Sequence, residues 1–211
     1  MATTVGAIPT TPVVRTLPQR VRRILLQPAT EWPVIEREER RASDLYLGYI
    51  VPLAAIPPIA TLIGTSVMGV RLPFGGSYRV PLGSALVSAV VQYALGLVGI
   101  YVFAVIIDLL APHFGGTPNR IQALKVAAYA STASYIAGIA SLAPALSILG
   151  IAGLYSLYLI YLGLPVLMRA PRERALGYSA AAVVSAIGLF LVAGLITSRF
   201  VAYPSLSLPV R

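Results

Sequence analysis

The most regular feature of the sequence is a series of long apolar runs separated by short polar stretches. A helix needs about 20 apolar residues to cross the hydrocarbon core of a bilayer, and lipid offers its backbone no hydrogen-bond partners. Five runs meet this requirement, and short connections between them favour antiparallel neighbours. The sequence therefore predicts an all-α integral membrane bundle of five transmembrane helices, at residues 45–68, 82–110, 121–142, 144–168 and 175–198.

The segments that flank these runs predict a simple domain organisation. Residues 1–16 are rich in Thr and Pro without periodicity, which is typical of a disordered tail. Residues 17–44 are predicted to form a cytoplasmic amphipathic region. The five helices make one transmembrane domain at 45–198, and residues 199–211 form a short tail on the outside.

The amphipathic region carries an apolar helical face flanked by arginines. A basic amphipathic helix beside membrane spans is expected to lie at the cytoplasmic headgroups, and Trp is typical of the membrane boundary. This surface either docks a cytosolic partner or is a solvated interfacial helix. The predicted interfacial residues are Arg20, Arg22, Arg23 and the single tryptophan, Trp32.

The first span contains three prolines, Pro52, Pro57 and Pro58. Each removes a hydrogen-bond donor and clashes with the preceding turn, so the helix should kink or break near the middle of the membrane. Broken spans expose backbone groups to substrates in many transporters, whereas kinks stabilised by neighbouring helices are equally common. Both interpretations stay open.

The stretch at residues 101–129 holds the most informative polar residues. Asp108 lies about one turn before one span ends, and Lys125 lies about one turn after the next begins. Because the two helices are antiparallel neighbours, we expect the two side chains to face each other at similar depth. Asn119 and Arg120 lie in the loop between them. The pair is either a structural clamp or a site for an ion, a proton or a headgroup.

Tyrosines could extend this polar site. Three of them lie on roughly one face of the fourth span, and buried phenols usually find hydrogen-bond partners. They either line a polar cavity or pack with satisfied hydroxyls. The candidate polar site or clamp then comprises Asp108, Asn119, Arg120, Lys125, Tyr129, Tyr155, Tyr158 and Tyr161.

Composition supports the membrane prediction and excludes several functions. Only 11% of the residues are charged, against about 25% in soluble domains, and mean hydropathy is +0.82. The net charge of +9 lies outside the apolar runs, where anionic lipid headgroups explain it better than nucleic acid does. One histidine, no cysteine and no catalytic motif predict no catalytic residue, cofactor or metal site, so the protein is not expected to be an enzyme.

The distribution of basic residues predicts the orientation. Cytoplasmic segments carry an excess of Lys and Arg. Eleven basic residues lie in 1–44, in the loop between Asp108 and Lys125 (Arg120 alone) and in 169–174, against four on the opposite side. The N-terminus is therefore predicted to be cytoplasmic and the C-terminus outside, in the cytoplasmic membrane of a bacterium.

Three collinear segments resemble the Yip family, most closely its bacterial branch: VPLAAIPPIATLIG (51–64), IIDLLAPHFGGTPNRIQALKVAAYAST (106–132) and YSLYLIYLGLPVLMRAPRERALGY (155–178). The resemblance covers nearly all of residues 28–198. It implies five spans, a cytoplasmic N-terminus and a C-terminus outside. In eukaryotic members the family acts in vesicle traffic through GTPase and partner binding.

Two functions follow as hypotheses. The first is a non-enzymatic scaffold or adaptor that contacts lipid or protein at its cytoplasmic face. Rows of small residues in the third and fifth spans favour close helix packing, a homo-oligomer or contact with other membrane proteins. The second is a small transporter, channel or lipid-handling protein. In that case the broken first span, Asp108, Lys125 and the tyrosines would converge on one water-accessible cavity.

Overall fold

A computed structural model describes residues 15–71 and 77–200 of the chain. The predicted disordered tail lies outside the described residues up to residue 14, and the predicted outside tail does so from residue 201. The described part is helical apart from one short two-stranded ladder. Its N-terminal half comprises α1 (Leu17–Leu26), α2 (Pro28–Arg37), α3 (Ala42–Leu45), the π-helical η1 (Tyr46–Ile50), α4 (Val51–Ala54), α5 (Ile56–Ile63), the π-helical η2 (Gly64–Met68), β1 (Val70–Arg71), β2 (Ser77–Tyr78) and α6 (Leu82–Leu110). The remainder comprises the 3₁₀ helix η3 (Ala111–Phe114), α7 (Arg120–Ala130), α8 (Thr132–Ala137), the 3₁₀ helices η4 (Gly138–Leu142) and η5 (Pro144–Leu154), α9 (Tyr155–Leu167) and α10 (Arg172–Ser198).

Four helical stretches are long and apolar enough to cross a membrane: Ala42–Met68, Leu82–Phe114, Gly150–Leu167 and Arg172–Ser198. They correspond to four of the five predicted spans. The remaining predicted span, residues 121–142, folds as α7, α8 and η4, with a turn at Ser131 between α7 and α8. The all-helical membrane fold is therefore confirmed, whereas the number of five spans stays a prediction.

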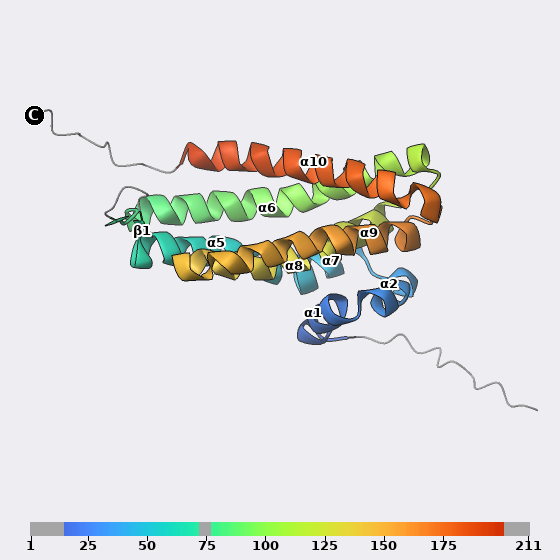
Figure 1. The fold of residues 1–211 in the computed structure, drawn as a ribbon, viewed down its shortest axis with the longest axis horizontal. Helices are drawn as coiled ribbons and strands as arrows, with labels where there is room; N and C mark the ends of the chain where they lie inside the picture. Colours follow the sequence, from blue (N-terminus) through green and yellow to red (C-terminus); the bar gives the residue numbers. More distant parts are fainter. Residues whose placement is uncertain (1–14, 72–76, 201–211) are drawn as a thin grey trace, which may run out of the picture.

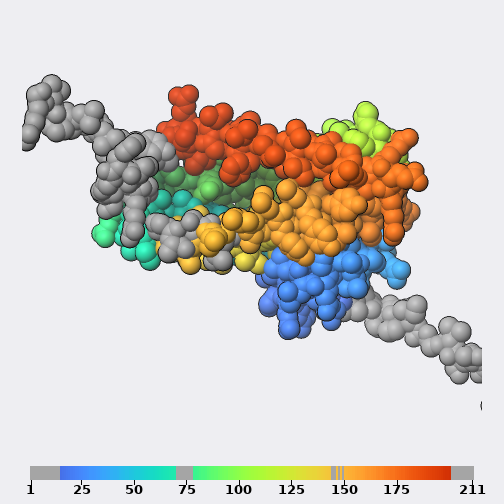
Figure 2. All heavy atoms as spheres, in the orientation of Figure 1, coloured from blue at the N-terminus to red at the C-terminus, as the bar shows by residue number. Residues whose placement is uncertain are grey.

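The long helices lie side by side along one axis of the molecule (Figure 1). Helix α6 packs along both α7 and α10, and α9 packs against α7, α10 and α2. Figure 2 shows α1 and α2 as a separate mass seated on one side of the bundle. We call α1 and α2 together, residues 17–37, the N-terminal unit.

Helix α7 is the most enclosed helix of the bundle. Every residue from Ala123 to Ala130 is buried, including Lys125. The helix begins at a conventional cap, because the Oδ1 atom of Asn119 accepts a hydrogen bond of 3.1 Å from the amide of Gln122. Asn119 therefore has a structural partner within its own helix.

The first span is interrupted near its prolines. Helix α4 ends at Ala54 and α5 begins at Ile56, one residue before the Pro57–Pro58 pair. A Cβ atom on Gly138 of η4 would lie only 2.7 Å from the Cγ of Pro57, so this neighbour must be a glycine for the helices to approach. Pro58 is buried, whereas Pro52, earlier in the span, is exposed. This packing favours a kink held by neighbouring helices.

Candidate functional site

The N-terminal unit is fixed to the bundle by a buried tryptophan. Trp32 is fully buried and meets the ring of Tyr129 edge-on, with 6.5 Å between centroids. A Cβ atom on Gly163 of α9 would lie 2.7 Å from the indole Cζ2, so the glycine leaves a notch for the ring. The prediction that Trp32 lies at the lipid boundary is therefore wrong, because a groove on another helix takes up its apolar surface.

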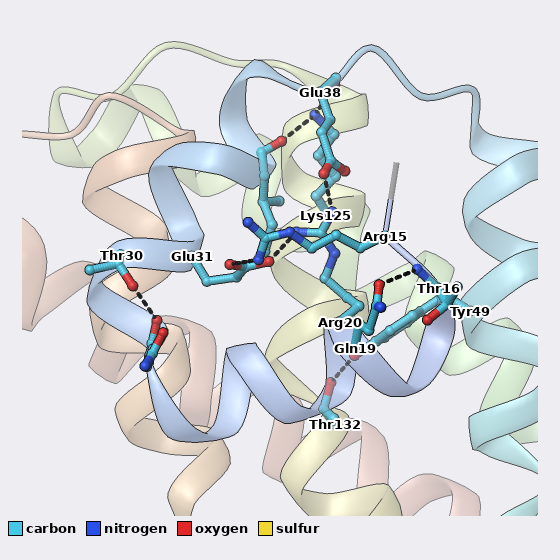
Figure 3. Close-up of polar contacts among 12 residues, drawn as sticks. Arg15, Thr16, Gln19, Arg20, Thr30, Glu31, Glu38, Tyr49, Lys125 and Thr132 are labelled. Carbon is cyan, nitrogen blue, oxygen red and sulfur yellow. Dashed lines mark hydrogen bonds and ion pairs between the residues drawn. The ribbon is translucent and has the colours of Figure 1, made fainter. Parts of the chain in front are cut away.

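A buried ion network continues from this contact (Figure 3). Arg20 of α1 is only 2% exposed, and its guanidinium donates to Glu31, at 2.5 Å, and to Glu38. Arg15 donates to the other oxygen of Glu31, and Arg40 to the other oxygen of Glu38. Arg20 is therefore enclosed by the protein and does not present its charge to headgroups as predicted, because a buried carboxylate, Glu31, and a largely enclosed one, Glu38, take up its guanidinium.

Lys125 reaches the same region from α7. Its ammonium donates to the backbone oxygens of Ile35, Glu36 and Glu38, at 2.8, 3.4 and 2.6 Å. The last carbonyl groups of a helix have no partner within the helix and carry partial negative charge. Lys125 therefore caps the C-terminal end of α2 and joins the N-terminal unit to the centre of the bundle.

The predicted pair of Asp108 and Lys125 is wrong. Within the described residues, Asp108 instead pairs with Arg120, with 3.1 Å between Oδ2 and Nε, and its Oδ1 is buried without a hydrogen-bond partner. The two helices are neighbours as predicted, but Arg120 is the first residue of α7 and lies beside Asp108. Lys125 is more than one turn further along, where α2 supplies its partners.

The four tyrosines of the predicted site lie in different environments. The side chains of Tyr158 and Tyr161 are 47% and 43% exposed on the outside of α9. The hydroxyl of Tyr155 donates to the backbone oxygen of Leu25 at 3.0 Å, and Tyr129 is fully buried in the core. Tyr158 and Tyr161 thus lie on the outer surface of α9, and the convergence of the tyrosines with Asp108 and Lys125 on one cavity stays a hypothesis.

An open pocket of about 610 Å³ does lie beside the network. It is lined by residues 36–41 together with Asp44, Ile121, Gln122 and Lys125. Of the predicted site, only Lys125 contributes to it. Glu31, Glu38 and Arg40 are not among the predicted site residues, although five of the seven acidic residues lie in residues 31–44. That concentration of acids was the available signal for a charge network.

Comparison with known proteins identifies the family. The profile of the Yip1 domain family matches residues 22–195. The chain is 30% identical over 105 residues to the inner membrane protein YohC of Escherichia coli strain K12, and equally to YohC of E. coli O6:H1. These matches cover 50% of this chain and 54% of the relatives, so the chain spans about half the length of the curated relatives it matches. No solved structure matches. The profile covers most of the chain, including the N-terminal unit from Arg22 onward and all four candidate spans, and the protein therefore belongs to the Yip1 domain family.

Proposed function

We propose that the protein is a non-enzymatic scaffold or adaptor of the bacterial inner membrane, which holds its N-terminal unit rigidly at the cytoplasmic surface to contact lipid or protein. The observation that carries this proposal is a pair of buried contacts: Arg20 joins α1 to Glu31 of α2, and Lys125 of α7 joins α2 to the bundle. Within α1, Arg22 and Arg23 remain exposed. A surface fixed in this way suits docking, and the tyrosine positions give no support to transport.

The proposed topology has five spans, with the N-terminus inside and the C-terminus outside. The enclosed position of α7 supports a fifth crossing, because a helix sheathed by its neighbours needs less apolar surface than one facing lipid. The relatives named inner membrane proteins support the bacterial location. Accordingly, the domain boundaries proposed are 17–44 for the cytoplasmic region and 45–198 for the membrane domain.

The level of the membrane surface follows from two exposed tyrosines. The amides of Gly116 and Thr117 bond to the carbonyls of Ala111 and Met168, which places the ends of α6 and α9 at one level. Tyr101 and Tyr158 each lie ten residues from that level, or about 15 Å along their helices. Exposed tyrosines are typical of membrane boundaries. Charged residues on the cytoplasmic side of these two tyrosines, including Lys125, would then lie at the cytoplasmic edge of the membrane.

Helix α1 lies close to this level, since the Tyr155 hydroxyl contacts the backbone of Leu25. Its exposed arginines would face anionic headgroups there, and each basic residue near such a surface contributes about 1 kcal/mol. We therefore propose anionic lipid as one contact of the cytoplasmic face. The second proposed contact is a protein partner that binds the same surface or the neighbouring pocket.

The topology predicts a clear labelling pattern. The chain has no cysteine, so a single cysteine reports one position. We expect Gln19→Cys to react with a membrane-impermeant maleimide only after the cells are opened, and Arg199→Cys to react in intact cells. Labelling of both positions from the same side would contradict an odd number of spans.

Lipid contact predicts selective energy transfer from Trp32, the only tryptophan, to a dansyl-labelled lipid in nanodiscs. Transfer to dansyl-phosphatidylglycerol should exceed transfer to dansyl-phosphatidylcholine and should fall with added salt. Replacing both Arg22 and Arg23 with Gln should weaken the anionic-lipid preference by about tenfold or more. Arg37→Gln, which removes an exposed arginine of α2, is the matched control. Equal transfer to both lipids would leave a protein partner as the only contact of this face.

A further inference from the structure

The open pocket beside the buried network has charged groups of its own, which the docking of the N-terminal unit uses only in part. One wall is the chain between the end of α2 and α3, with residues 36–41 and Asp44, and the other is the first two turns of α7. Ile121 is the single apolar side chain among the ten lining residues. A pocket of about 610 Å³ with this lining suits a polar, charged ligand.

Three of the four acidic side chains in the lining already have partners. Glu38 accepts from the guanidinium groups of two arginines, and Glu36 pairs with Arg169 at 3.3 Å. Asp44 accepts a hydrogen bond of 3.3 Å from the backbone amide of Arg41, at the start of α3. These carboxylates are therefore largely occupied by groups of the protein itself.

The basic side chains of the lining are left in excess. In the described part of the chain, neither Arg37 nor Arg41 has a carboxylate partner, and both side chains are exposed. The ammonium of Lys125 contacts backbone oxygens there and no carboxylate. Glu39 is the one lining acid without a partner among the same residues. Three cations thus face one free carboxylate, and the pocket favours an anionic ligand.

The backbone of the wall between α2 and α3 is also free to bind. Glu38 and Arg41 have extended backbone angles, and the residues between them belong to no helix or strand. Among the described residues, the amides and carbonyls of Glu39 and Arg40 form no hydrogen bond within the protein. An extended peptide can pair with such a segment, because its own backbone supplies both donors and acceptors.

We propose that this pocket binds an acidic, extended segment of a cytosolic protein, with carboxylates at Arg37 and Arg41 and its backbone along Glu39 and Arg40. A planar guanidinium holds a carboxylate through two parallel hydrogen bonds. A phosphate ester would satisfy the arginines but offers few donors for the free carbonyls. The inference rests on the proposed function, which places the pocket with Lys125 at the cytoplasmic edge, and it names the chemistry of the protein contact.

The experiment measures fluorescence anisotropy with the full chain in nanodiscs of neutral phosphatidylcholine. The probe is a short fluorescein-labelled peptide of alternating Glu and Ser, and the matched peptide has Gln in place of Glu. We expect the acidic peptide to bind about tenfold more tightly than the Gln peptide, and methylation of its backbone nitrogens to weaken binding.

Two double variants test the location of this binding. Replacing both Arg37 and Arg41 with Gln should weaken binding of the acidic peptide about tenfold or more. Replacing both Arg172 and Arg174 with Gln is the matched control, because these arginines are equally exposed but do not line the pocket. Emission from Trp32 verifies that the N-terminal unit stays docked in both proteins.

Three outcomes would overturn the proposal. These are equal binding of the acidic and Gln peptides, equal losses in the two double variants, or displacement of the peptide by an equal concentration of glycerol 3-phosphate. The last result would assign the pocket to a small phosphorylated ligand. The anionic-lipid preference that depends on Arg22 and Arg23 should be unchanged by the loss of Arg37 and Arg41. Failure of peptide binding with this preference intact would therefore overturn the inference and leave the proposed lipid contact standing.

Discussion

Replacing Arg20 with Met should loosen α1 from α2 and thereby destabilise the docked N-terminal unit by about 3–5 kcal/mol. The guanidinium is 2% exposed and bridges Glu31, at 2.5 Å, to Glu38. Met replaces the apolar stem of arginine but carries no guanidinium, so two carboxylates that are largely removed from water would each keep a single arginine partner. The free energy arises mainly from the charges left behind.

Trp32 gives a direct measurement of this effect. Its ring is fully buried between the N-terminal unit and the bundle, so undocking should shift its emission to longer wavelength and expose it to acrylamide. We expect the urea midpoint of this signal to fall sharply in Arg20→Met. Arg22→Met, on the exposed side of the same helix, should change the docking free energy by less than about 0.5 kcal/mol.

A double-mutant cycle separates charge from packing. If the network is the cause, Glu31→Gln should recover part of the loss in an Arg20→Met background, because it removes one of the two carboxylates that lost the Arg20 guanidinium. The stability of the Arg20→Lys protein should lie between those of the wild type and Arg20→Met, since an ammonium cannot reach two carboxylates as a planar guanidinium does. An Arg20→Met protein as stable as the Arg22→Met protein would show that the network does not hold the unit.

The fold was predictable from sequence because bilayer thickness imposes its own length scale. The apolar run at residues 82–110 coincides with α6, and the runs at 45–68 and 175–198 differ from the observed helices by three residues at their N-terminal ends. The enclosed segment at 121–142 was harder, since it carries the buried Lys125 and breaks at Ser131. The length of an apolar run predicts well a helix that faces lipid, but it predicts less well a helix that is surrounded by protein.

The site was less predictable because its contacts join distant parts of the chain. The notch for Trp32 is at Gly163, and the partners of Lys125 lie near residue 35. Periodicity and the neighbour rule place α6 beside α7 but do not indicate that α2 packs against α9, where Lys125 of α7 reaches it. Local sequence therefore predicts lipid as the environment of Trp32 and Asp108 as the partner of Lys125, because each is the nearest suitable one along the chain.

The two interpretations of Lys125 predict opposite results for two substitutions. Because its ammonium holds the carbonyls of Ile35 and Glu38, Lys125→Met should take the ammonium donor from the Glu38 oxygen and leave the Ile35 oxygen with only the Glu38 amide, at a cost of about 3 kcal/mol of docking free energy. It should also speed hydrogen exchange of the amides at the end of α2. Asp108→Asn should leave the Trp32 signal unchanged, because Asp108 pairs with Arg120 instead.

Arg37→Met is the matched control, because Arg37 is also basic and lies in the last turn of α2 but is exposed. Its loss should cost only a few tenths of a kcal/mol through the helix dipole. If Lys125→Met and Arg37→Met behaved alike, the ammonium would not be the cap of α2. If Asp108→Asn instead matched Lys125→Met, the two side chains would act as the pair that the sequence suggested. Loss of docking in Lys125→Met alone would establish that the bundle holds its cytoplasmic unit through a helix end, a contact that depends on backbone geometry and therefore leaves no motif in the sequence.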